Sequence, residues 1–428
     1  MARTPVVLVH GYSDSGRSFR AWRDLLVEHG YRPEEVRVCS YRTQTNEVTI
    51  KDLAEGFDRA LRAQAGLGDG QPFDAIVHST GMLVVRSWLT QYAGRRTRLK
   101  HLIGIAPATW GSPLAHKGRS WLGAIFKGNR DVMDPDFMDA GHEVLDALEL
   151  GSRFTWDLAH LDLLGGETYY GPSDRTPWVF TLCGIESYTG LRGIVNAPGT
   201  DGTVRWAGCA LNTRKIRLDL TIERTTAGRA TVAPWTNVDS SFVPIAGVNH
   251  GTILTDPRKG DKLVDLVLRA LQVRTRKDYG QWQRAAAAGT APAHTRLERD
   301  LGLWQQFVVR ATDERGDPID DYHLQLVSPE DNPFREAAAF ELDVHTYRRD
   351  PSLRCFHLDL RKLQSGDHGR LRVRVMASAA STLVTYHGHG SEKAPGDGVD
   401  GAGKWDGQLD IASVLGEQHV KLFYPFTT

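Results

Sequence analysis

The chain has 428 residues, of which 41% are hydrophobic and 24% are charged. These proportions are those of an ordinary folded protein and exclude extensive disorder, and the length is sufficient for two or three domains. The 52 lysines and arginines balance 52 aspartates and glutamates, so no overall field draws the chain to nucleic acid or to an anionic membrane. No apolar run approaches the roughly 20 residues that a transmembrane helix needs.

Two features bear on the compartment in which the protein works. The first apolar run begins at about residue 5, in MARTPVVLVHG, and leaves no room for a signal peptide before it. We therefore expect a cytoplasmic protein, or a secreted one if a leader has been removed. Cys39, Cys183, Cys209 and Cys355 are far apart and mostly lie in apolar, strand-like stretches, which predicts buried thiols, with one disulfide as the alternative.

Strand-like and helix-like stretches alternate over the first 270 residues. Short apolar runs bounded by turn residues predict strands at residues 6–9, 36–41, 73–77, 102–106, 178–184 and 242–247. Apolar residues spaced three and four apart predict helices over residues 48–64, after residue 81 and over residues 263–271. This alternation is typical of an α/β fold with a doubly wound, mostly parallel sheet that helices cover on both faces.

Residues 111–171 form a connection much longer than the few residues that usually join a strand and a helix. Trp110 precedes this stretch, and Trp121 and Phe126 are among the many large apolar side chains within it. These side chains are compatible with a small core of their own. They are equally compatible with a helical lid, whose apolar underside would use Trp110, Trp121 and Phe126 to bind an apolar ligand.

The pattern changes after residue 284. The stretch RAAAAGTAPAHT consists of small residues and proline and predicts a linker over residues 284–302. Beyond it, apolar and polar residues alternate with a period of two in about seven short runs, separated by turn sequences such as ERGDP and SGDHG. We therefore predict an α/β domain over residues 1–283 and an all-β, sandwich-like accessory domain over residues 303–428, which contains no cluster of acid, histidine and nucleophile.

Three polar residues follow predicted strands of the first domain, in the order Ser79, Asp201 and His250. A serine hydroxyl is a poor nucleophile unless a histidine takes its proton, a carboxylate orients that histidine and amide groups bind the developing oxyanion. The carboxyl ends of parallel strands share one edge of the sheet, so these side chains can meet there. Taken alone, Ser79 would more often be a helix cap, and the ordered set favours catalysis.

The carboxylate has two candidates. Glu186 lies close to the end of the strand 178–184, whereas Asp201 lies at the end of a further loop. We favour Asp201 because PGTDG is rich in turn-forming residues and can return the chain toward His250. The other histidines show no metal-ligand spacing, so we expect neither a metal nor a cofactor.

Residues 1 to about 272 resemble a bacterial lipase or esterase of the α/β-hydrolase superfamily. VVLVHGYSDSGRSF is similar to the oxyanion loop, IVHSTGM to the nucleophile elbow, IAPATWGSPLA to the segment after the next strand, and TDGTV and NHGTIL to the acid and histidine loops. The resemblance implies that Ser79 is the nucleophile, His250 the general base and then acid, and Asp201 the orienting carboxylate. It further implies that the amides of Tyr12 and Thr80 form the oxyanion hole.

The activity that the resemblance implies is that of a serine carboxylic ester hydrolase, a lipase or esterase that cleaves esters of apolar acyl groups through an acyl-enzyme. Its partners would be small lipid or ester molecules and, transiently, a lipid interface, but not nucleic acid. Two other hypotheses stay open: an acyltransferase that uses the same triad, and a non-catalytic binding protein on a hydrolase scaffold. The natural ester and the oligomeric state are not determined by these motifs.

Overall fold

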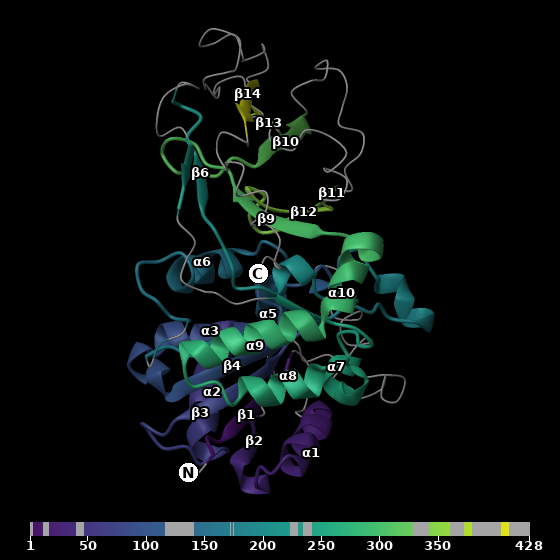
Figure 1. The fold of residues 1–428 in the computed structure, drawn as a ribbon. Helices are drawn as coiled ribbons and strands as arrows, with labels where there is room; N and C mark the ends of the chain where they lie inside the picture. Colours follow the sequence, from purple (N-terminus) through teal and green to yellow (C-terminus); the bar gives the residue numbers. More distant parts are fainter. Residues whose placement is uncertain are drawn as a thin grey trace. The chain divides into compact units, whose positions relative to one another are not determined.

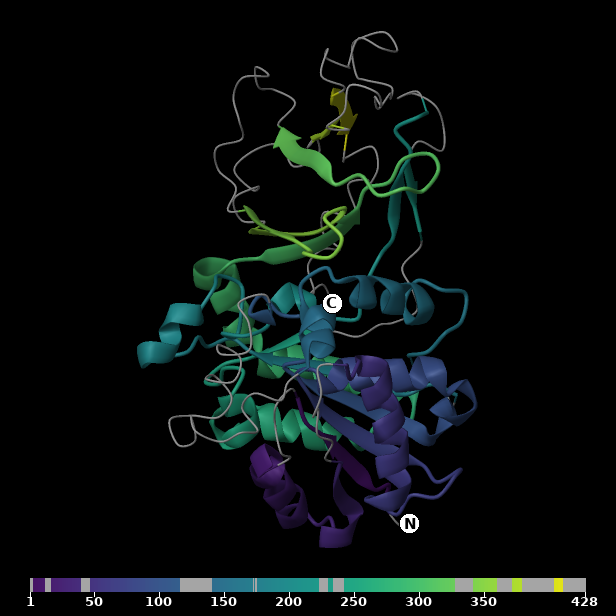
Figure 2. The same cartoon turned by 180° about the vertical axis from the view of Figure 1, so that it is seen from behind.

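A computed structural model of the chain describes residues 3–11, 17–39, 47–115, 141–171, 173, 175–222, 230–233, 242–327, 342–359, 372–378 and 404–410 (Figures 1 and 2). The chain divides into two compact units. Residues 1–213 and 236–301 form the first unit, and residues 214–235 and 302–427 form the second. None of the described helices is both long enough and apolar enough to span a membrane.

The first unit is built on a six-stranded parallel sheet with the order β2-β1-β3-β4-β5-β8. Its strands are β1 (Val6–Val9), β2 (Val36–Cys39), β3 (Phe73–His78), β4 (Leu99–Ile105), β5 (Trp178–Gly184) and β8 (Phe242–Ile245). Strands β1, β3, β5 and β8 are buried along their whole length, because helices cover both faces of the sheet. The parallel α/β sheet predicted from the sequence is confirmed.

Helices lie on both sides of this sheet. In Figure 1, α8 (Leu263–Ala270) and α9 (Arg276–Gly289) lie in front of the strands, and Figure 2 shows α2 (Ile50–Ala63) and α3 (Gly81–Gln91) on the opposite side. A further helix, α1 (Arg20–Glu28), lies between β1 and β2 in the chain. Helix α2 begins with a capping box, in which Thr49 and Asp52 each accept a hydrogen bond from the other's backbone amide.

The stretch predicted as a linker differs from that expectation, because residues 284–301 are helical. Helix α9 starts at a capping box formed by Thr275 and Asp278, and it is followed by α10 (Ala291–Arg296) and a last turn over Leu297–Leu301. Alanine is the strongest helix former, and the proline lies in the first turn of α10, where it is tolerated. Trp282 is buried and donates a hydrogen bond to the Leu266 carbonyl at 2.9 Å, so α9 belongs to the first unit.

The described part of the long insertion belongs to the first unit and contains α5 (His142–Leu148) and α6 (Arg153–Asp162). Arg86 of α3 donates hydrogen bonds to both oxygens of Asp162 at 2.8 and 2.9 Å, and both side chains are fully buried. The Tyr170 hydroxyl donates to the same carboxylate at 2.5 Å. Residues 116–140, which include Trp121 and Phe126, lie outside the described residues, so the lid stays a prediction.

The second unit is all-β in its described residues, as predicted. It contains two antiparallel sheets of three strands, with the orders β10-β13-β14 and β11-β12-β9. The strands are β9 (Trp304–Arg310), β10 (Asp321–Val327), β11 (Leu342–Thr346), β12 (Leu353–Asp359), β13 (Arg372–Ser378) and β14 (Lys404–Asp410). The unit also includes the hairpin of β6 (Ile216–Leu218) and β7 (Ala230–Val232), which the sequence analysis had placed in the α/β domain.

The ion pair between α3 and α6 generates a prediction about stability. Asp162→Asn leaves Arg86 buried without its counter-charge, so we expect a loss of about 3–5 kcal/mol in the free energy of unfolding. Urea denaturation measures this loss. The matched control is Asp157→Asn on the same helix, whose ion pair with Arg153 is 55% and 46% exposed and should change stability by about 1 kcal/mol or less. Equal losses in the two variants would contradict the prediction.

Candidate active site

Ser79 occupies the turn between β3 and α3. Its φ angle is 53°, in the left-handed region that residues other than glycine rarely adopt. The turn is anchored to the end of β4, because the Ser79 amide donates to the Ile105 carbonyl at 3.4 Å and the Ala108 amide donates to the Ser79 carbonyl at 3.1 Å. A serine held in this strained strand-to-helix turn has the geometry of a nucleophile elbow.

Two glycines allow the elbow to approach the end of β1. A Cβ atom on Gly81 would lie 2.7 Å from the Val9 carbonyl oxygen, and one on Gly11 would lie 2.9 Å from the Ser79 Cβ. Val77 stands where the usual elbow motif has its first glycine, and it is fully buried in the sheet opposite Val9. The close backbone approach therefore depends on Gly11 and Gly81.

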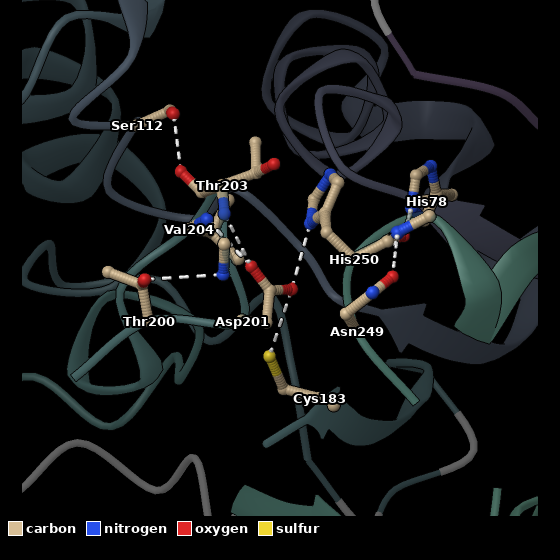
Figure 3. A network of polar contacts seen from close by, with 12 residues as sticks. His78, Ser112, Cys183, Thr200, Asp201, Thr203, Val204, Asn249 and His250 are labelled. Carbon is tan, nitrogen blue, oxygen red and sulfur yellow. Dashed lines mark hydrogen bonds and ion pairs between the residues drawn. The ribbon is translucent and has the colours of Figure 1, made fainter. Parts of the chain in front are cut away.

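Asp201 and His250 form a buried hydrogen-bonded pair (Figure 3). The His250 Nδ1 atom lies 2.8 Å from the Asp201 Oδ2 atom, and both side chains are fully buried. The His250 backbone amide also donates to the Asp201 carbonyl at 3.0 Å. Because a carboxylate only accepts, Nδ1 carries the hydrogen, and in the neutral ring Nε2 is the basic nitrogen. This is the tautomer that a general base for a serine needs.

The loop after β5 holds the Asp201 carboxylate in place. Its Oδ1 atom accepts hydrogen bonds from the amides of Thr203 and Val204 at 3.0 and 2.8 Å. The loop is tied down in turn, because Ser112 donates to the Thr203 carbonyl at 2.6 Å and the hydroxyls of Tyr188 and Thr203 lie 2.9 Å apart. These supports could not be predicted from the sequence, in which the turn-forming residues of PGTDG indicate only that the chain can return toward His250.

His78 connects the elbow to the histidine loop. Its Nε2 atom donates to the His250 carbonyl at 3.0 Å, and the two ring centroids are 4.7 Å apart. Burial, with the charge of a protonated His250 as a smaller cause, holds the pKa of His78 well below its usual value, so this imidazole is neutral. His78, the residue before Ser79, therefore contacts the backbone of His250 directly.

Glu186, the other candidate carboxylate, makes different contacts. Arg296 of α10 donates to both of its oxygens at 2.6 and 2.9 Å, and the Gly247 amide donates at 3.0 Å. The hydrogen bonds from Arg296 lower the pKa of Glu186. Its carboxylate thus pairs with an arginine at a partly exposed position, whereas the Asp201 carboxylate is bound to His250.

Of the remaining predicted site residues, the structure describes two, Thr80 and Trp110. Thr80 is the cap residue at the start of α3 and is buried. Trp110 is also largely buried, with its amide donating to the Gly208 carbonyl at 3.1 Å. Tyr12, Trp121 and Phe126 lie outside the described residues. Within the part of the chain that the structure describes, no group of three or more histidines, cysteines or carboxylates could hold a metal ion.

Comparisons with known proteins agree with this architecture. Phospholipase PlaB from Legionella pneumophila is similar over 90% of this chain and 88% of its own, with a TM-score of 0.74 and 24% identity. The chain has the α/β-hydrolase fold. The structure of PlaB in complex with thio-NAD shares this fold over 96% of this chain and 90% of its own, with a TM-score of 0.75 and 24% identity. No protein-family model and no curated protein matches the sequence.

The elbow of this α/β-hydrolase fold generates a prediction about Gly81. Gly81→Ala would press a methyl group against the Val9 carbonyl, which is backbone and cannot rotate away, so we expect a loss of about 1–3 kcal/mol in the free energy of unfolding. Gly56→Ala is the matched control within α2. No atom lies within 4 Å of its added methyl, so stability should rise by about 0.5–1 kcal/mol. Thermal unfolding of both variants would refute the prediction if Gly81→Ala were as stable as the parent.

Proposed function

We propose that the chain is a serine ester hydrolase that cleaves carboxylic esters of apolar acyl groups. The observation that carries the proposal is the buried pair of Asp201 and His250, which His78 ties to the strained turn of Ser79. A buried imidazole with a carboxylate on Nδ1 and a serine in a neighbouring elbow is the arrangement that acyl transfer requires. The likeness to PlaB supports the proposal through the fold.

In this mechanism Ser79 Oγ attacks the ester carbonyl while His250 Nε2 takes the hydroxyl proton. The amides of Tyr12 and Thr80 donate hydrogen bonds to the oxyanion, and Asp201 stabilises the imidazolium through Nδ1. The tetrahedral intermediate collapses, the bond to the alcohol oxygen breaks, and His250 gives its proton to the leaving alcohol. Water, deprotonated by His250, then attacks the acyl-enzyme and releases the carboxylic acid and free Ser79.

The substrate class follows from the insertion. Its apolar side chains, Trp110, Trp121 and Phe126 in our proposal, would bury the acyl chain and exclude water from the intermediate. Small lipid or ester molecules are the proposed partners, with transient contact to a lipid interface. An acyltransferase would use the same three residues, and an added acceptor alcohol that diverts the acyl group from water to a new ester would identify that activity.

Removing the nucleophile tests the proposal. Ser79→Ala should abolish labelling by a fluorophosphonate probe and lower kcat on p-nitrophenyl butyrate by at least about 10³-fold, because binding and the oxyanion hole alone leave only residual catalysis. The matched control is Ser87→Ala, which removes another buried serine hydroxyl from α3 and should keep both labelling and turnover. Near-normal turnover in a folded Ser79→Ala variant would end the proposal, as would an unlabelled parent chain.

Replacing each of the two carboxylates by its amide tests which of them orients His250. Asp201→Asn should favour the wrong tautomer of His250 and lower kcat by about 10⁴-fold. Glu186→Gln should lower kcat far less, because that carboxylate pairs with Arg296. Rates on the same ester, with circular dichroism to verify folding, give the comparison. The reverse order of losses would transfer the role to Glu186 and leave the assignments of Ser79 and His250 unchanged.

A further inference from the structure

We propose that Cys183 is a positioning residue of this site, whose thiol donates a hydrogen bond to the same oxygen of Asp201 that accepts the hydrogen of His250. The Cys183 Sγ atom lies 3.4 Å from Asp201 Oδ2, and His250 Nδ1 lies 2.8 Å from that oxygen. Figure 3 shows the thiol and the imidazole reaching the oxygen from opposite directions. The inference rests on the proposed function, because it concerns the acid of that mechanism.

The direction of this hydrogen bond follows from the state of the thiol. Cys183 lies near the end of β5 and is fully buried, and burial raises the pKa of its thiol well above the usual value. The nearby Asp201 carboxylate acts in the same direction, since two negative charges would repel each other. The thiol therefore keeps its hydrogen at neutral pH, and the carboxylate can only accept it. Low reactivity follows from the same burial, so oxidation or metal binding is not its chemistry.

The contacts of Asp201 explain what this thiol adds. Its Oδ1 atom is held by two backbone amides, whereas its Oδ2 atom has the imidazole and the thiol as donors. The amides of Thr203 and Val204 fix one oxygen, and Cys183 restrains rotation of the other away from His250. It also gives Oδ2 a second hydrogen-bond donor beside His250 Nδ1.

Among the described residues, Cys209 and His78 are ionisable groups that lie close to this arrangement. Cys209, after the short turn Trp206–Gly208, is also fully buried, and burial raises the pKa of its thiol. Its thiol also forms a side-chain hydrogen bond with the Cys183 thiol, whereas the thiol hydrogen bond to Asp201 among the described contacts comes from Cys183. His78, from the end of β3, is neutral as described above. The acidic limb of the pH–rate profile should therefore report on His250 and the carboxylate that faces it.

The test compares Cys183→Ala and Cys183→Ser with Cys209→Ala, which removes a neighbouring buried thiol of the same size. With p-nitrophenyl butyrate, Cys183→Ala should lower kcat by roughly three- to tenfold, the effect of one hydrogen bond, and leave KM nearly unchanged. Its acidic limb should move to higher pH, because the whole charge of Oδ2 then stabilises the imidazolium. Cys183→Ser supplies a hydroxyl donor and should restore kcat and the parent profile, and Cys209→Ala should keep both.

A second readout does not depend on turnover. The low-field proton resonance of the His250 Nδ1–H group should shift in Cys183→Ala and stay in place in Cys209→Ala. If Cys183→Ala does not fold, the same resonance in Cys183→Ser and Cys209→Ser decides. Because a hydroxyl is a stronger donor than a thiol, the resonance should shift in Cys183→Ser even though the rate is retained, and it should stay in place in Cys209→Ser. Identical rates, profiles and resonances in the Cys183 and Cys209 variants would overturn the inference. A parent chain without hydrolysis would instead overturn the ester hydrolase, while the resonance would still test the thiol.

Discussion

The hydrogen bond between Asp201 and His250 is the interaction on which the rest of the site depends. An ionised carboxylate buried without partners costs several kcal/mol, so the fold must surround Asp201 with donors. The chain meets this requirement with one imidazole, two amides of the acid loop and one thiol from β5. Each donor comes from backbone or a side chain that the sheet already holds in place, and the pair is therefore oriented before any substrate binds.

The strained turn at Ser79 also depends on the contacts that surround it. A left-handed φ angle at a serine is unfavourable by roughly 1–3 kcal/mol, and surrounding contacts must compensate for it. Hydrogen bonds to Ile105 and from Ala108 fix the turn, and the absence of side chains at Gly11 and Gly81 lets it lie against β1. The compensation comes from residues at the ends of β1 and β4, which are distant from Ser79 in the sequence, so the residues around Ser79 alone do not reveal it.

The features of the fold that could be predicted from the sequence are those set by interactions between residues close together in the chain. The strand at residues 73–77 and the position of Ser79 after it follow from local apolar patterning, and the described fold agrees with them. The alanine-rich stretch after residue 284 has a composition that suits both a linker and a helix, and burial of Trp282, a long-range effect, favours the helix. The contacts of His78 and Cys183 depend on which strands are neighbours, and local patterning does not contain that information.

The strand order separates Ser79 from His250, and the end of β4 lies between them. Ser79 follows β3, whereas His250 follows β8, and β4 and β5 lie between them in the sheet. The chain does not continue β4 in a straight line beyond Ile105. Instead Ala106 adopts a φ angle of 47°, its amide donates to the Leu182 carbonyl at 2.7 Å, and the chain turns back to the Ser79 carbonyl through Ala108. The left-handed φ angles at Ala106 and Ser79 thus lie at the same edge of the sheet, where His78 also donates its hydrogen bond to the His250 carbonyl.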